Sequence, residues 1–167
     1  VHAVNAALGN VGFTVTFTAE PGDEADGREG IEKLAAQLGA GSVDTLLILG
    51  GNPVYDAPAD LALGDLVGRC PNAIHLSLFD DETSARCRWH LPRAHALESW
   101  GDVRAWDGTV SLVQPLIAPL YGGRTAAEIV ARTLGEQTTA HDLVKRTFFE
   151  TAAGADVDAA WRRALAD

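Results

Sequence analysis

Two polar segments directly follow apolar runs, and both carry groups that can hold a ligand. "GGNP" at residues 50–53 follows "TLLIL", and "FDDETS" at residues 79–84 follows "AIHLSL". The glycines let the backbone approach a ligand closely, and Asn52 offers an amide that can donate hydrogen bonds. The acidic residues at 80–82 offer oxygens that accept hydrogen bonds from ribose hydroxyls or a purine ring. The pattern indicates a ligand of the nucleotide type.

Both segments also have an ordinary structural explanation. A buried strand needs a turn before the next helix, and such a turn uses the same glycines. Asp80 or Asp81 would equally suit a helix start at 80–87, where an acidic side chain caps the chain and favours the positive end of the helix dipole. "GGNP" is neither a Walker loop nor a Gly-x-Gly-x-x-Gly fingerprint. The residues alone leave ligand loop and plain turn both open.

The sequence offers no pattern typical of a catalytic or metal site. His90, His95 and Glu98 lie close together, but their spacing matches no standard zinc motif. There is also no Gly-x-Ser-x-Gly nucleophile segment. We therefore predict no catalytic residue and no metal ligand, and we expect Glu98 or Asp102 to support a loop.

Composition and charge limit the class of partner. The chain has 167 residues, of which 47% are hydrophobic, and a formal net charge of −10. The charge argues against nucleic acid or an acidic membrane surface as a partner. No apolar run approaches the roughly 18 residues that span a bilayer, so we expect no direct membrane insertion. The chain has no Met and opens on residues typical of a helix interior, which predicts a single α/β domain at 1–167 excised from a longer chain.

Cysteine and tryptophan residues are interpreted as structural. Cys70 and Cys87 fit no metal-binding spacing, and free thiols are favoured over a disulfide. Trp89, Trp100 and Trp106 cluster around the His-rich loop and the predicted hairpin, where packing in the core or at an interface is favoured over stacking on a ligand.

Hydrophobic periodicity predicts the elements that position the two polar segments. "TLLIL" at 45–49 has no alternation, which is typical of a strand buried on both faces of a parallel sheet. Further strands are predicted at 13–18, 73–79 and 88–92, a hairpin with an Asp107-Gly108 turn at 103–113, and helices at 1–8, 31–41, 57–70, 125–135, 139–154 and 156–167. The fold class is therefore α/β, with a mainly parallel Rossmann-like sheet flanked by helices and a late β-hairpin. Ligands of such sheets bind beyond the carboxyl ends of the strands.

Capping residues mark several predicted helix ends. Asp56 suits the N-cap of the 57–70 helix, with Pro58 in its first turn. Thr125 and Glu128 form a capping box before the 125–135 helix, and Thr139 repeats the device in the next one. The loop at 19–30 is polar and glycine-rich.

Four segments together resemble the molybdopterin oxidoreductase family. They are "ALGNVG", "LLILGGNPVYDAPADL", "HLSLFDDETSARCRWHLPRAHALESWGD" and "DGTVSLVQPLIAPLYGG". The likeness runs from about the first residue to Trp161 and is closest to the iron–sulfur-associated, molybdopterin-like large subunits of alternative complex III, a quinol-oxidising membrane assembly. The two long central segments are the specific ones.

The resemblance implies a cofactor and a set of residues. Catalytic members of the family bind molybdenum or tungsten through two molybdopterin guanine dinucleotides, one of which lies across an α/β domain of this kind. On that basis the cofactor-binding residues would be Gly51, Asn52, Asp80, Glu82 and Thr83. The protein ligand to the metal lies elsewhere in catalytic members, and no cysteine set for an iron–sulfur cluster is present here.

The resemblance also implies a role. In the complex III subunit the corresponding domain is thought to hold no cofactor, so the expected function is a scaffold without molybdopterin guanine dinucleotide, and this fragment alone is not expected to be catalytic. Its partners would be other domains of the same large subunit and membrane-complex subunits, at the exported face of a bacterial cytoplasmic membrane. The alternatives are a working half-site for the dinucleotide and an unrelated small-nucleotide-binding module.

Overall fold

The computed structural model describes residues 1–17, 27–151 and 156–166. The strands are β1 (Thr45–Leu49), β2 (Asn72–Ser77), β3 (Trp89–Pro92), β4 (Gly101–Arg104) and β5 (Val110–Val113). The helices are α1 (His2–Ala7), α2 (Gly27–Gly39), α3 (Pro53–Asp56), α4 (Leu63–Arg69), α5 (Ala126–Thr133), α6 (Ala140–Thr151) and α7 (Val157–Ala164), with short 3-10 turns η1 (Ala59–Leu61) and η2 (Ser84–Arg86).

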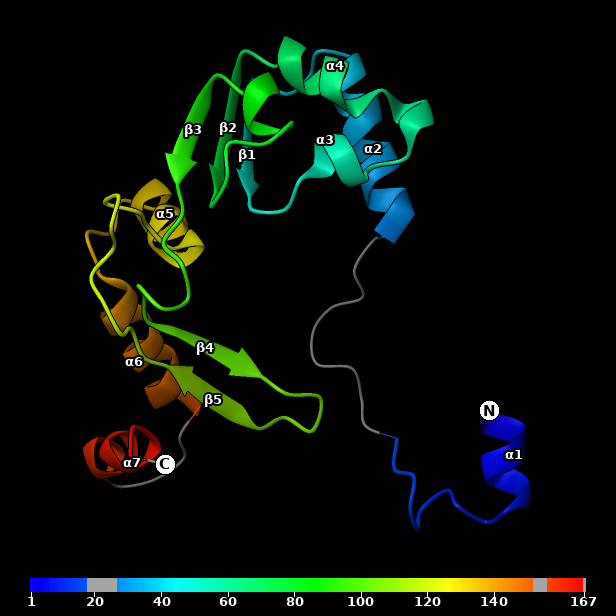
Figure 1. Ribbon diagram of the computed structural model, residues 1–167, viewed down its shortest axis with the longest axis vertical. Coiled ribbons are helices and arrows are strands. Elements are labelled where there is room, and N and C mark those ends of the chain that lie inside the picture. Colours follow the sequence, from blue (N-terminus) through cyan, green and yellow to red (C-terminus); the bar gives the residue numbers. More distant parts are fainter. Residues whose placement is uncertain (18–26, 152–155, 167) are drawn as a thin grey trace.

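A parallel sheet and an antiparallel hairpin form the two β units (Figure 1). The sheet has three strands in the order β1-β2-β3, all parallel, so their carboxyl ends lie at one edge. The hairpin pairs β4 with β5 and turns at Gly108, whose φ of +88° is the left-handed conformation that glycine allows. The predicted α/β class, with a parallel sheet and a late hairpin, is confirmed.

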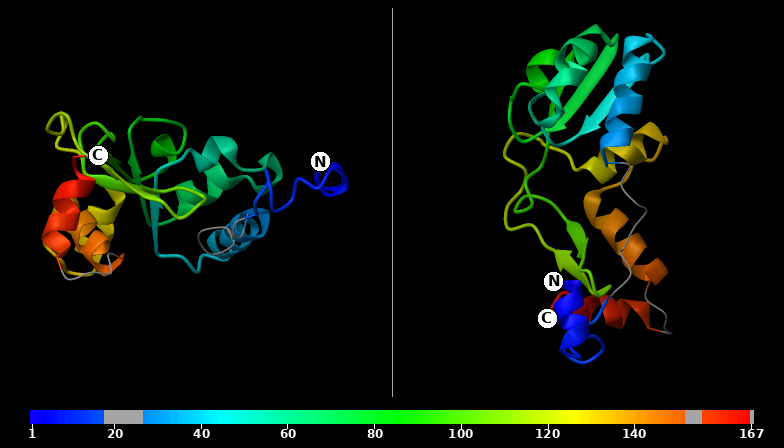
Figure 2. Two further views of the ribbon diagram at one scale, coloured as in Figure 1. Left: turned by 90° about the horizontal axis from the view of Figure 1, so that it is seen from below. Right: turned by 90° about the vertical axis from the view of Figure 1, so that its right-hand side faces the viewer.

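Helices α2 and α4 pack against the sheet and form the main core (Figures 1 and 2). Leu38 of α2 and Val67 of α4 meet Ala73 of β2, and Leu46 and Ile48 of β1 pack against this cluster. The prediction that "TLLIL" is buried on both faces is wrong, because β1 lies at the edge of the sheet and its residues are half-buried or exposed. The central, most buried strand is β2.

The N-terminal region differs from its predicted strand. Residues 11–15 form a turn closed by a bridge between Val11 and Val15, and residue 18 lies outside the described part of the chain. Phe13 is 92% exposed, and no strand among the described residues pairs with this alternating segment. Helix α1 is present as predicted, and Gly9 follows its last residues with a φ of +68°.

The predicted helix at 57–70 is divided. Ala62 adopts a left-handed conformation with a φ of 48°, which separates η1 from α4. The helical segment also begins earlier, at Pro53, so that Asn52 is the N-cap and Asp56 ends α3 instead of capping the next helix. Pro53, not Pro58, is the proline of the first turn. Helix α2 likewise begins at Gly27, inside the predicted loop, of which residues 19–26 lie outside the described part.

The C-terminal helices begin as predicted. The Thr125 hydroxyl accepts from the Glu128 N–H, and the Glu128 carboxylate accepts from the Thr125 N–H, which is a complete capping box. The Thr139 hydroxyl accepts from the Asp142 N–H at the start of α6. Residues 152–154 of the predicted 139–154 helix lie outside the described residues.

Of the three tryptophans predicted to pack in the core or at an interface, Trp100 packs within the described residues. Trp89 and Trp106 are 57% and 67% exposed. Trp100 instead stacks on Trp161 of α7 with a centroid distance of 6.0 Å, because α6 and α7 lie beside the hairpin and bring their aromatic rings to it. Cys70 and Cys87 are both free, as favoured, and burial raises the pKa of the Cys87 thiol.

A backbone crossing joins the sheet to the C-terminal helices. Directly after β3, the Ala94 N–H donates to the Arg124 carbonyl oxygen at 3.0 Å, and the Arg124 N–H donates to Pro92 at 3.1 Å. Gly123 permits this contact, since a Cβ there would lie 2.8 Å from the Ala94 nitrogen. Across residues 1–17, 27–151 and 156–166, no helix is long and apolar enough to cross a membrane.

Candidate functional site

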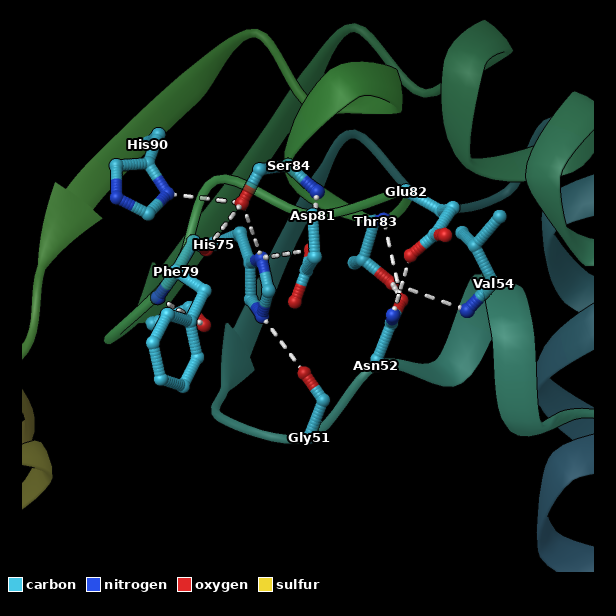
Figure 3. A network of polar contacts seen from close by, with 11 residues as sticks. Gly51, Asn52, Val54, His75, Phe79, Asp81, Glu82, Thr83, Ser84 and His90 are labelled. Atoms are coloured by element: carbon cyan, nitrogen blue, oxygen red, sulfur yellow. Dashed lines mark hydrogen bonds and ion pairs between the residues drawn. The ribbon is translucent and has the colours of Figure 1, made fainter.

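The two segments predicted to hold a ligand meet at the carboxyl edge of the sheet (Figure 3). The glycine loop, residues 50–52, leaves β1, and the acidic turn, residues 78–84, leaves β2. Asn52 joins them, because its Nδ2 donates to Glu82 Oε2 at 2.6 Å while its Oδ1 accepts from the Thr83 hydroxyl at 2.7 Å. Asn52, Glu82 and Thr83 therefore form one hydrogen-bonded group.

Thr83 anchors this group in the protein interior. Its side chain is fully buried, its backbone N–H donates to Asn52 Oδ1 at 3.3 Å, and its hydroxyl accepts from the Val54 N–H at 3.0 Å. Val54 lies in the first turn of α3, so the hydroxyl satisfies one of the N–H groups that the start of a helix leaves open. The side chains of Asn52 and Thr83 are thus engaged within the protein, and Thr83 acts on any ligand only through Asn52.

Asn52 also sets the charge state of Glu82. The hydrogen bond from the Asn52 amide, followed by one from its own backbone, holds the pKa of the Glu82 carboxyl below its ordinary value of 4.5. A lowered folded-state pKa means that the ionised carboxylate stabilises the fold above the unfolded value. That contribution is lost as the pH falls through the folded value.

Asn52→Ala is expected to raise the pKa of Glu82 toward its ordinary value, because the amide donor is removed. The measurement is a pH titration of the side-chain carboxyl resonances by NMR. Asp107 is an internal control, since its pKa is lowered by the backbone N–H of Thr109 in the remote hairpin and should not move. An unchanged Glu82 midpoint would show that the amide contact is not formed in solution.

The remaining predicted residues stand at the two sides of this group. The Gly51 carbonyl oxygen faces the His75 ring, and Gly51 has a φ of +73°. Asp80 is exposed, and its carboxylate makes no hydrogen bond or ion pair within the part of the chain that the structure describes. Gly51, Asn52, Glu82 and Thr83 thus lie together in one connected edge, with Asp80 beside them. Their role as ligand-binding residues stays a prediction.

His75 is the buried centre of the edge. It lies in β2 with no exposed surface. Its Nε2 contacts the Gly51 carbonyl oxygen at 3.0 Å, and its Nδ1 contacts Ser84 Oγ at 2.8 Å (Figure 3). The His75 ring therefore contacts both the glycine loop and the acidic turn. Asn52 connects the same two segments through a separate set of hydrogen bonds.

The contact with Gly51 fixes the role of one ring nitrogen of His75. A carbonyl oxygen only accepts, so Nε2 carries the proton that it donates to Gly51. On the other side of the ring, Nδ1 contacts the Ser84 hydroxyl, which also donates to the Phe79 carbonyl oxygen at 3.3 Å. His90 Nδ1 lies 2.8 Å from the same hydroxyl oxygen. The chain His90–Ser84–His75–Gly51 is a continuous row of hydrogen bonds across the edge.

The composition of this row resembles a Ser-His-Asp triad, but the geometry does not. Asp81 Oδ1 lies 3.5 Å from His75 Nδ1, the same nitrogen that faces Ser84. In a working triad the serine and the carboxylate face opposite ring nitrogens. Ser84 is also buried, and Asp81 accepts from its backbone N–H at 2.9 Å. The group positions the two loops rather than presenting a nucleophile.

Two hollows open on either side of the glycine loop. One, of about 400 Å³, is lined by Gly50, Gly51, Asn52, Ser77, Leu78, Phe79, Asp81 and Arg93. The other, of about 500 Å³, is mostly apolar and is lined by Gly27, Arg28, Ile31, Gly50, Gly51, Asn52, Pro53, Asp56, Ala57 and Pro58. The glycine loop and the acidic turn therefore share a concave surface, which is the geometry that a ligand between them requires.

Other residues named from the sequence have structural partners. Glu98 supports a loop as expected, because its carboxylate accepts from the His95 and Leu120 N–H groups. His90 and His95 point to different partners, Ser84 and the Leu97 N–H. Among the described residues, no group of three or more His, Cys, Asp or Glu side chains is placed to hold a metal ion.

Sequence reasoning missed His75, Ser84 and Arg93 as members of this edge. A signal for His75 was available, because a polar residue within the apolar run "AIHLSL" needs a buried partner, whereas the run does not identify Ser84 as that partner. Arg93 is the first residue after β3. The rule that ligands bind beyond strand carboxyl ends would have selected it together with the other two loops.

Comparison with known proteins gives one partial match. A segment of 87 residues, 50% of this chain, is 31% identical to the menaquinone reductase molybdopterin-binding-like subunit of Nitratidesulfovibrio vulgaris. The match covers 13% of that subunit's length. No family model matches the chain. The likeness supports a domain related to the molybdopterin oxidoreductases.

Proposed function

We propose that this chain is a domain of the large subunit of a molybdopterin-type respiratory oxidoreductase and serves as a cofactor-free scaffold in a quinol-oxidising electron-transfer complex. The sheet edge supplies one wall of a cleft, and other faces dock against further domains of the same subunit and against membrane-complex subunits. The match to a menaquinone reductase subunit supports the assignment to a multi-subunit reductase.

The observation that carries the scaffold role is the internal use of the predicted ligand groups. The Asn52 amide and the Thr83 hydroxyl bind each other, Glu82 and the start of α3. The buried His75 ring also contacts both loops, at Gly51 and at Ser84. Because these polar groups are satisfied by the protein itself, the edge can keep its shape without a cofactor.

Metal and pterin analysis of the intact protein tests this role. Molybdenum, tungsten and molybdopterin guanine dinucleotide are expected far below one equivalent per chain. A catalytic molybdenum enzyme purified and analysed in parallel controls for cofactor loss during handling. Near-stoichiometric metal with dinucleotide would overturn the scaffold role and leave the relation to the family intact.

A working half-site for molybdopterin guanine dinucleotide is the second candidate. The hollow beside the glycine loop favours it, since Gly51 and Asn52 line that concave surface. Under this alternative, Asn52→Ala should strip the dinucleotide from the intact protein while circular dichroism shows a folded chain. Under the scaffold role there is no dinucleotide to lose.

A further inference from the structure

Cys70 and Cys87 stand before the amino ends of two neighbouring strands. Cys70 follows α4 and lies two residues before β2, whereas Cys87 follows η2 and lies two residues before β3. The pairing of these parallel strands reaches back toward the cysteines, because the Arg88 N–H donates to the Ala73 carbonyl oxygen at 2.9 Å. Paired strands run about 4.8 Å apart. The two cysteines therefore enter the sheet next to each other, at the end opposite the glycine loop.

Both cysteine side chains belong to the same apolar core. Cys70 is 9% exposed and is part of the cluster formed by α2, α4 and β2, and Cys87 is half-buried and packs against that cluster. The short turn η2, which precedes Cys87, packs on α4, which precedes Cys70. An ion pair of 3.6 Å between Arg86 and Asp65 joins the same two elements. The packing of α4 on η2 thus holds the two cysteines on one side of the sheet.

The two thiols differ in accessibility and influence each other. Burial raises the pKa of the Cys87 thiol, and the nearby charges of Asp81 and of an ionised Cys70 raise it further. The sulfur atoms are therefore close enough to interact electrostatically. The Cys70 thiol is the more buried one, and its Sγ lies 3.5 Å from the Val43 carbonyl oxygen as a weak donor. A reagent in solution reaches Cys87 first.

We infer that Cys70 and Cys87 form an oxidisable dithiol, which a small disulfide such as oxidised glutathione converts into a disulfide within the chain. The Cys87 thiolate attacks one sulfur of the reagent, forms a mixed disulfide and releases one glutathione thiolate. The Cys70 thiolate then attacks the Cys87 sulfur and releases the second glutathione. The protein loses two electrons and two protons, and both pass to the two glutathione molecules. The structure describes the dithiol form.

The disulfide closes a loop from residue 70 to residue 87. This loop contains the whole of β2, with the buried His75, and the acidic turn. A disulfide stabilises a protein mainly by restricting the unfolded chain. Oxidation therefore stabilises the central strand without a change at the glycine loop. Because Cys70 is almost fully buried, the pairing stays within one chain. This modification site goes beyond the scaffold role and is independent of any cofactor.

Oxidation of the intact protein by oxidised glutathione tests the dithiol. The reaction is run at about pH 8.5, near the ordinary pKa of a thiol, because the thiolate is the attacking form. Free thiols are then alkylated with iodoacetamide, and mass spectrometry is carried out on the intact protein and on its peptides. The expected product has lost the mass of two hydrogen atoms, takes up no alkyl group at either cysteine and yields one peptide pair linked through Cys70 and Cys87. Dithiothreitol should reverse the change.

Cys70→Ala is the matched control, because it keeps the accessible thiol and removes the resolving one. This variant should stop at the mixed disulfide and carry one glutathione at Cys87, whereas the native protein should carry none. A native protein that retains glutathione, keeps both thiols or links only to a second chain would overturn the dithiol.

Urea unfolding tests the consequence for stability. The oxidised native protein should unfold at a higher urea concentration than the reduced protein, and Cys87→Ala should show no such shift after the same treatment. An unchanged or lower midpoint in the oxidised native protein would overturn the stabilising role. None of these failures bears on the metal and pterin content that tests the scaffold role.

Discussion

Replacing His75 by alanine is expected to lower the free energy of unfolding by about 3–5 kcal/mol, as loss of a large buried side chain together with its hydrogen bonds implies. The ring is fully buried in the central strand and is the contact that joins the Gly51 carbonyl oxygen to Ser84. Its removal leaves a cavity and a buried Ser84 hydroxyl without this partner. Urea unfolding followed by circular dichroism measures the change from the transition midpoint.

Two further variants separate the two ring nitrogens. His75→Gln can place an amide nitrogen near the position of Nε2 and keep the bond to Gly51, whereas His75→Asn can replace only the Nδ1 contact with Ser84. Each should be less destabilising than His75→Ala. A loss below about 1 kcal/mol in the alanine variant, the size of one ordinary hydrogen bond, would contradict the described burial and contacts.

Asn52→Ala is expected to lower the free energy of unfolding by about 2 kcal/mol, because the hydroxyl and the backbone N–H of the buried Thr83 lose their acceptor, and Glu82 loses its amide donor. The side chain makes contacts of 2.6, 2.7 and 3.3 Å to these two residues. The expected loss of stability is therefore larger than for a turn residue that makes a single hydrogen bond. The same urea unfolding experiment measures it.

Exchanging the donor and the acceptor of the Asn52–Glu82 hydrogen bond tests whether the two side chains interact. Asn52→Asp places two carboxylates face to face where Nδ2 now meets Oε2 at 2.6 Å. Combining it with Glu82→Gln restores one donor and one acceptor in reversed order. The double variant should be more stable than Asn52→Asp alone, and strict additivity of the two changes would show that the side chains do not interact.

The local sequence pattern predicted those elements whose structure depends on interactions between residues close together in the sequence. "TLLIL" is a strand because an unbroken apolar run ended by glycines packs readily on helices, and the capping box at Thr125 starts α5 because both of its bonds are local. The alternating segment around Phe13 failed, since a strand requires a neighbour and pattern alone does not supply one. The division at Ala62 was not visible either, because a left-handed alanine carries no sequence signal.

The site was predictable in position and not in chemistry. Asn52 and Glu82 were placed at one edge by the rule for parallel strands. Their mutual hydrogen bond could not be anticipated, because it depends on the distance between two turns that are 30 residues apart in the sequence. The edge position of β1 has the same cause, since strand order is set by long-range pairing.

The crossing of residues 92–94 with 123–124 has a consequence for how this protein can vary. The chain that leaves β3, makes the hairpin and returns to α5 starts and ends at hydrogen-bonded neighbours. The tip of its hairpin, which includes Trp106, is exposed. Such a closed excursion tolerates changes in length and sequence at its tips without moving its ends. Insertions or substitutions at the hairpin tip are therefore expected to leave the carboxyl ends of the strands in place.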